Sequence, residues 1–171
     1  FHHLDVLNHS FQALAMMDPA VLGLVQWSGR IFDWINTGQR GMAAISADEI
    51  HRGVYSHTLD IKQPKKGRND KEKGSLADSR GRAIRLCELL VLHYSDAVAC
   101  KEMAQDWRPR LPISEQVVAR AASHRQTDTL LQDMALIENT RLEIDRNINI
   151  GLSMAVLFEG LIDHVSRDQS N

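Results

Sequence analysis

The stretch that most constrains the fold is the pair of apolar helical segments from Thr127 to Val165. The two segments join across residues 146–149 without a glycine- or proline-rich linker. The first carries an apolar face, interrupted by Arg141, that contains Leu130, Met134, Ile137 and Ile144. The second repeats this spacing with Met154, Leu157, Phe158, Leu161 and Val165, and widens it with Leu152, Val156 and Ile162. The last helix is therefore predicted to be almost fully buried, within a bundle formed by the rest of the chain.

Helical periodicity and capping signals recur through the other segments. We expect helices at 4–17, 19–35, 49–61, 80–107 and 115–124. Start signals precede three of them: Asp18-Pro19, a capping box that begins at Ser46, and Ser114. Thr127 is expected to cap the helix that follows. No segment alternates with a period of two. The 171 residues therefore predict an all-α fold, a single helical domain (1–171) built as one bundle of about six or seven helices.

Residues 62–79 differ sharply in composition from the rest of the chain. They contain one leucine, no aromatic residue, and six of the chain's 20 Lys and Arg between Lys62 and Lys73. Such a segment buries too little apolar area to offset the entropy of ordering it. We expect a disordered, flexible charged loop, solvated rather than bound to phosphates, because Asp70 and Glu72 dilute the basic run.

Composition and missing motifs exclude several classes of function. The net charge of −2 gives no general reason to expect contact with nucleic acid. Cys87 and Cys100 lie on one predicted helix, too far apart to bridge, which favours a reduced compartment. No uncharged run approaches the roughly 20 residues of a membrane span. Phosphate-loop, dinucleotide, zinc and hydrolase motifs are absent from the sequence. We therefore predict a cytoplasmic protein with no cofactor, no small-molecule ligand and no membrane partner.

Two weaker constellations each have a plain structural interpretation. His2, His3, Asp5 and His9 could supply metal ligands, but we favour a solvated terminus and predict no metal site. Glu159 stands among apolar residues, where a carboxylate is tolerated only if it is paired. We favour an ion pair with Arg141 or Arg146 over a role for Glu159 as a general base.

Arg52 and His57 are separated by four residues, and this R-x4-H spacing resembles the ribonuclease motif of the all-α HEPN family. In that family Arg and His from two subunits act together on a phosphodiester. Gly53 departs from the polar residue that usually follows the Arg. A HEPN-like ribonuclease or toxin-type domain is therefore the alternative function, in which His57→Ala should abolish RNA cleavage.

A second resemblance covers about half of the chain, from Arg80 to Val165. The helix RAIRLCELLVLHYSDAV, the break after it, and IENTRLEIDRNINIGLSMAVLFEGLI resemble the C-terminal domain of the delta-prime subunit of the bacterial DNA polymerase III clamp loader. That family carries a run like R-N-x-N before an apolar helix with an embedded glutamate. The matching positions here are Arg146, Asn147, Asn149 and Glu159. We expect Asn149 to cap the last helix by accepting a hydrogen bond from the amide of Gly151 or Leu152.

This resemblance implies a non-catalytic collar domain that packs against the other clamp-loader subunits of a ring. The ring loads the sliding clamp onto primed DNA, and this domain would make no direct contact with nucleic acid. In the full subunit the domain follows an ATPase-like module, and we expect a longer protein because the chain opens on Phe1. The mechanism implied is assembly, through a helix face that a partner completes.

Overall fold

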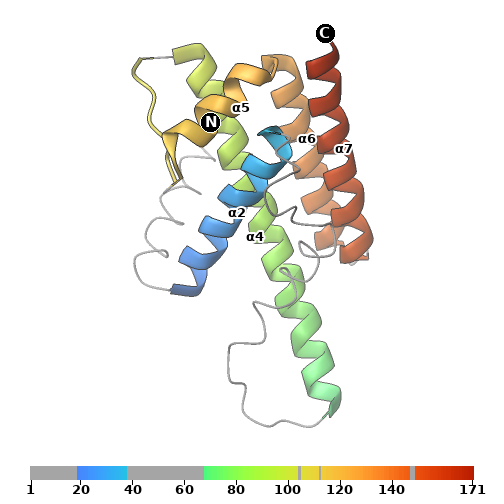
Figure 1. The fold of residues 1–171 in the computed structure, drawn as a ribbon. Helices are drawn as coiled ribbons and strands as arrows, with labels where there is room; N and C mark the ends of the chain where they lie inside the picture. Colours follow the sequence, from blue (N-terminus) through green and yellow to red (C-terminus); the bar gives the residue numbers. More distant parts are fainter. Residues whose placement is uncertain (1–18, 38–67, 104, 112, 147–148) are drawn as a thin grey trace.

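The computed structural model describes residues 19–37, 68–103, 105–111, 113–146 and 149–171, with the backbone alone described at 19–22, 37 and 68–79. These residues form helices and no strand, which confirms the all-α fold. The helices, labelled as in Figure 1, are α2 (Pro19–Thr37), α4 (Arg68–Met103), α5 (Glu115–His124), α6 (Thr127–Asp145) and α7 (Ile150–Ser170). The described part thus has five helices rather than six or seven, and the helices expected at 4–17 and 49–61 lie outside it. None of the described helices combines the length and apolar content needed to cross a membrane.

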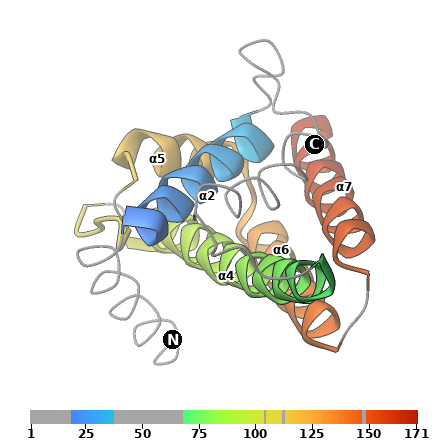
Figure 2. The same ribbon diagram turned by 90° about the horizontal axis from the view of Figure 1, so that it is seen from below.

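Helix α4 is the central element of the bundle. It packs most extensively along α6 and also contacts α2, α5 and α7. Figure 2 shows α2 and α5 on one side of α4, and α7 beside α6. The buried core draws on all five helices, and Phe32 of α2 packs edge-on against Tyr94 of α4 with ring centroids 5.1 Å apart.

The start of α4 corrects the prediction of a loop over residues 62–79. The helix begins at Arg68, so residues 68–79 are helical, while 62–67 lie outside the described residues. The prediction considered only how little apolar area this segment buries. Helical hydrogen bonds are local, however, and extending an existing helix through good helix formers such as Lys and Glu is far easier than starting a new one. The N-terminal part of α4 consequently extends past the other described helices (Figure 1).

The boundaries between the later helices were predicted with mixed success. Helix α4 ends at Met103, four residues before the expected Trp107. Helix α5 ends at His124 as expected, although its N-cap residue Ser114 makes no side-chain capping bond. The N-cap of α6 is Gln126, so Thr127 is the first residue of the helix and not its cap. The Thr127 hydroxyl donates to Glu102 Oε1 at 3.3 Å. Patterns thus placed these helices but not their capping contacts.

The start of α7 contains one capping contact that was predicted correctly. Asn149 is the N-cap of α7, and its Oδ1 accepts from the Leu152 amide at 3.1 Å. A side chain in this position satisfies one of the amides that the first helical turn leaves without a carbonyl partner. This capping bond therefore begins α7 at a defined residue, Ile150.

Replacing Asn149 by Ala should lower the free energy of unfolding by about 1 kcal/mol, because the Leu152 amide loses its acceptor. Urea denaturation followed by circular dichroism would measure the change. Ser114→Ala is the matched control, since Ser114 is also an N-cap but makes no capping bond, and it should change stability much less. Equal losses in the two variants would contradict a specific role for the Asn149 side chain.

Candidate functional site

The most unusual side chain in the structure is Arg125, a guanidinium buried between α5 and α6. Its side chain has no exposed surface. Arg125 Nη2 donates to Asp133 Oδ2 of α6 at 2.6 Å, and Nε donates to Asp168 Oδ2 of α7 at 2.7 Å. Nη1 donates to Asn36 Oδ1 of α2 at 2.5 Å. All three guanidinium nitrogens therefore have acceptors, as a buried charge requires.

Further polar contacts surround Arg125 and its partners in what we call the buried ion cluster, which consists of Arg125, Asn36, Asp133, His164 and Asp168. His164 Nδ1 lies 2.5 Å from Asp133 Oδ1, and Asn36 Nδ2 donates to the Tyr94 hydroxyl at 3.3 Å. The Thr129 hydroxyl donates to Asp168 Oδ1 at 2.8 Å. Through these contacts the buried ion cluster links α2, α4, α6 and α7 to the connection between α5 and α6.

The electrostatics of the buried ion cluster keep Asp168 ionised. Burial acts to raise the pKa of Asp168, but the hydrogen bonds from Arg125, Thr129 and the Gln126 amide outweigh it and hold the pKa below its usual value. The cluster therefore places an arginine cation between two carboxylates on different helices. Such an arrangement fixes the relative orientation of the helices rather than adding much net stability over apolar packing.

The pair formed by His164 and Asp133 has the geometry in which a carboxylate orients an imidazole for acid–base chemistry. A general base also needs a position from which it can reach a substrate. The His164 side chain is only 20% exposed, and neither of the two surface hollows described below is lined by His164. The arrangement is therefore better suited to holding α7 against α6 than to catalysis.

Glu159 corrects the prediction of a buried ion pair on the last helix. It is exposed, and it has no ion-pair partner among the residues that the structure describes. Arg141 instead pairs with Glu138 at 3.0 Å, one turn earlier on its own helix. Arg146 is the exposed C-cap residue of α6, and Asn147 lies outside the described residues. An exposed carboxylate is hydrated and needs no arginine, so the physical premise of the prediction does not apply.

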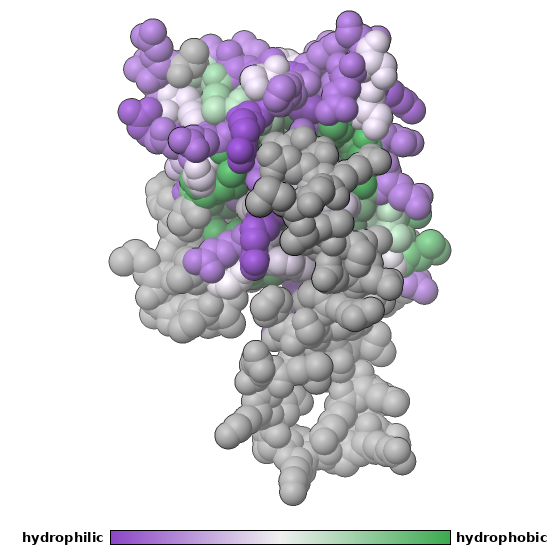
Figure 3. Space-filling view, viewed as in Figure 1, coloured by the Kyte–Doolittle hydropathy of each residue, from purple (hydrophilic) through white to green (hydrophobic). Residues whose placement is uncertain are grey.

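Helix α7 is also less buried than predicted. Its core face is formed by Ile150, Ser153, Met154, Leu157, Phe158, Leu161 and Val165. Leu152 and Val156 are instead 63% and 56% exposed, while Ile162 is half-buried. A row of exposed side chains on one side of the helix forms what we call the outer face of α7. It consists of Asn149, Leu152, Val156, Glu159 and Asp163. Figure 3 shows hydrophobic surface over the first half of α7 and hydrophilic surface toward its C-terminus.

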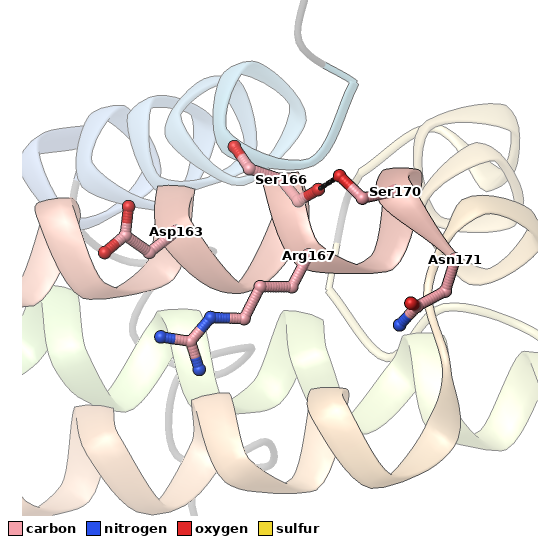
Figure 4. Close-up of a pocket in the computed structure, with 5 residues that line it drawn as sticks. All are labelled: Asp163, Ser166, Arg167, Ser170 and Asn171. Atoms are coloured by element: carbon pink, nitrogen blue, oxygen red, sulfur yellow. Dashed lines mark hydrogen bonds between the residues drawn. The ribbon is translucent and has the colours of Figure 1, made fainter.

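Two surface hollows, each of about 440 Å³, lie on the described surface, and the first of them adjoins the outer face of α7 at Asp163. The first is lined near the C-terminus of α7 by Asp163, Ser166, Arg167, Ser170 and Asn171. Figure 4 shows these residues on successive turns, with the Ser170 hydroxyl donating to the Ser166 carbonyl. All five are exposed, so water competes with any ligand for them. The second hollow lies between α2 and the start of α5, beside the ion pair of Asp33 with Arg120.

Two potentially reactive side chains are held inert in the core. Burial raises the pKa of the Cys87 thiol to about 12, so the thiolate needed for nucleophilic attack does not form at neutral pH. His93 is fully buried, and its Nε2 lies 2.8 Å from Ser28 Oγ, whose hydroxyl donates to the Val25 carbonyl. His93 Nδ1 has no hydrogen-bond partner. Since no substrate can reach it, this serine–histidine pair is a packing contact.

The burial of His93 makes stability depend on pH. Burial lowers the pKa of His93 from 6.5 to about 3, so between these values the unfolded chain binds a proton that the folded chain does not. Acidification below pH 6.5 should therefore reduce stability by up to about 1.4 kcal/mol per pH unit from this residue. His93→Gln, which retains a donor for Ser28 but does not titrate, should flatten the dependence measured by urea denaturation at several pH values.

The exposed His124 provides the control for this experiment. His124→Gln removes an exposed histidine instead, so the pH dependence that the buried His93 causes should persist in this variant. If His93→Gln and the wild type lose stability in parallel between pH 6.5 and 5, the buried neutral histidine is not the cause.

Several predicted candidates lie outside the described residues. They are the possible metal ligands His2, His3, Asp5 and His9, the HEPN-like pair Arg52 and His57, and the basic run before Arg68. These hypotheses stay predictions. Within the part that the structure describes, no three His, Cys, Asp or Glu side chains gather closely enough to hold a metal ion.

Sequence reasoning missed the buried ion cluster, although one signal for it was present. Asp133 occurs between Leu130 and Ile137 on the buried face of α6, where the spacing calls for an apolar residue. A carboxylate at such a position requires a buried cation. The partner, Arg125, lies in a connection that carries no helical pattern, so periodicity could not indicate it. Comparison of the chain with protein-family models, characterised proteins and solved structures gave no match.

Proposed function

We propose that this chain is a non-catalytic assembly domain of a DNA-replication clamp loader, which packs against neighbouring subunits through the outer face of α7. The observation that carries the assembly role is the exposure of Leu152 and Val156 on consecutive turns of that helix. Fully burying an aliphatic side chain of this size gains roughly 1.5–3 kcal/mol. A partner that covers both side chains would recover this free energy.

The buried ion cluster supports the same role from the opposite side of α7. His164 and Asp168 are bound to α6 and to Arg125, so α7 is held in one orientation by directional contacts as well as by apolar packing. A surface that is already in its binding conformation loses less entropy on association. The outer face of α7 is thus suited to recognising a partner without prior rearrangement.

The assignment to a clamp loader rests on the resemblance of residues 80–165 to the delta-prime C-terminal domain. Arg146, Asn147, Asn149 and Glu159 occupy the matching positions of the turn and the last helix. In this proposal the other clamp-loader subunits are the partners, and the domain is cytoplasmic and needs no cofactor of its own. ATP-driven work would belong to the parent complex.

Reconstitution with the other subunits of a DNA polymerase III clamp loader tests the proposal. Leu152→Ser combined with Val156→Ser should weaken association at least about tenfold, because central apolar contacts dominate interface energy. The matched control is Leu131→Ser combined with Leu142→Ser, two leucines of α6 that are 47% and 42% exposed. The control variant should assemble like the wild type. Size-exclusion chromatography and sedimentation velocity would measure complex formation.

Failure of the wild-type chain to associate with any of these subunits would contradict the clamp-loader assignment. Equal effects of the two double variants would contradict the choice of α7 as the contact surface. Deletion of α7 cannot replace these substitutions, because that helix contributes seven buried residues and its loss would unfold the chain.

A further inference from the structure

The outer face of α7 follows the spacing of a helix–helix seam. Asn149, Leu152, Val156, Glu159 and Asp163 are separated alternately by three and four residues, and all five are exposed. Such a row is the pattern along which one further helix packs against another. From Asn149 to Asp163 the row is about 21 Å long, enough for four turns of a partner helix.

The chemistry of this row changes along its length. Leu152 and Val156 make its first half apolar, whereas Glu159 and Asp163 make its second half acidic. Neither Glu159 nor Asp163 takes part in an ion pair within the described residues. Arg167 lies one turn beyond Asp163 on the same helix (Figure 4), and the ion pairs among the described residues do not include this pair. A helix that covers the row must therefore present apolar side chains to one half and cations to the other.

A second copy of this chain fits the row poorly. In a parallel pair Glu159 would face Glu159 and Asp163 would face Asp163 of the partner, and like charges at an interface disfavour association. In an antiparallel pair with full overlap, Val156 would face Val156, while Glu159 of each copy would lie against Leu152 of the other and Asp163 against Asn149. That arrangement removes the carboxylates from water without a cation to pair with them.

We propose that the outer face of α7 binds a basic amphipathic helix of a different protein, with leucine-like side chains over Leu152 and Val156 and Lys or Arg against Glu159 and Asp163. This inference rests on the assembly role proposed above and deepens it, because it specifies the chemistry of the partner element. The apolar half supplies most of the binding free energy. The acidic half selects the partner and sets its direction along α7.

Two synthetic helical peptides of 21 residues, the length of α7, test the proposal with the full chain. Both carry leucines along one seam; the first has Lys at the two seam positions facing Glu159 and Asp163, and the second has Glu there. Fluorescence anisotropy should show the Lys peptide binding at least about tenfold more tightly than the Glu peptide, with the difference shrinking at high salt. Glu159→Lys combined with Asp163→Lys should reverse the preference. Leu152→Ser combined with Val156→Ser should remove binding of both peptides.

All four substituted residues are exposed, so the variants should keep the wild-type circular dichroism spectrum. Equal binding of the two peptides, or binding that survives loss of Leu152 and Val156, would overturn the proposal. Concentration-dependent dimerisation of the chain that disappears in the variant with Leu152→Ser and Val156→Ser would also overturn it. That result would show that a second copy of the chain covers the outer face of α7. If clamp-loader subunits assemble with the chain but the Lys peptide does not bind, only this inference fails. If the peptide binds but the subunits do not assemble, only the clamp-loader function fails.

Discussion

Replacing Arg125 by Met should lower the free energy of unfolding by about 3–5 kcal/mol, which is a large share of the stability of a domain of this size. Methionine fills much of the space of the arginine side chain but supplies no charge and no donor. Asp133 and Asp168 would then remain in the core with too few donors, and the side-chain oxygen of Asn36 would lose the donor that Arg125 supplies. Guanidinium denaturation at neutral pH, followed by circular dichroism, would measure the loss.

Arg120 provides the matched control, since it also pairs with a carboxylate, Asp33, but at a half-exposed position. Arg120→Met should cost no more than about 1 kcal/mol. Arg125→Lys should be intermediate, because one ammonium group cannot reach three acceptors on separate helices. Near-wild-type stability of Arg125→Met would show that the buried ion cluster is dispensable for the fold.

Replacing Phe32 by Ala should cost about 3–5 kcal/mol through the loss of buried apolar surface and the cavity that remains. Phe32 has no exposed surface, and its ring packs against both Tyr94 and His93 of α4. These contacts join α2 to the central helix. The same denaturation experiment would detect the change, together with altered near-ultraviolet circular dichroism from Tyr94.

Leu131→Ala is the control for this substitution, because Leu131 is a large apolar residue that is 47% exposed on α6. Its loss should change stability by roughly 0.5 kcal/mol or less. If the two substitutions have similar costs, α2 does not pack against α4 as the structure has it.

Local sequence signals were sufficient for much of the fold. Pro19 begins α2, His124 ends α5 and Asn149 caps α7, because proline geometry and capping bonds act within a few residues. The charged residues after Arg68 misled the prediction, since composition reports the ability to bury surface and not the ability to form helical hydrogen bonds. The presence of each helix was therefore easier to predict than its length.

The candidate site was harder to predict because it depends on residues that are distant in sequence. Arg125 binds Asn36, 89 residues away, and Asp168, 43 residues away. No periodic pattern connects these positions. The exposure of Leu152 and Val156 was missed for a related reason: periodicity shows that a helix has apolar residues all round, but the number of neighbouring helices decides which of them are covered.

The distribution of partners around Arg125 also bears on how the native state opens locally. The carboxylates that balance Arg125 belong to α6 and α7, whereas α2 contributes only the neutral amide of Asn36. Detachment of α2 alone would therefore leave every ion pair of the buried ion cluster intact. We expect α2 to be the first cooperative unit to unfold, with amide protons that exchange faster with solvent than those of α6 in native-state hydrogen exchange.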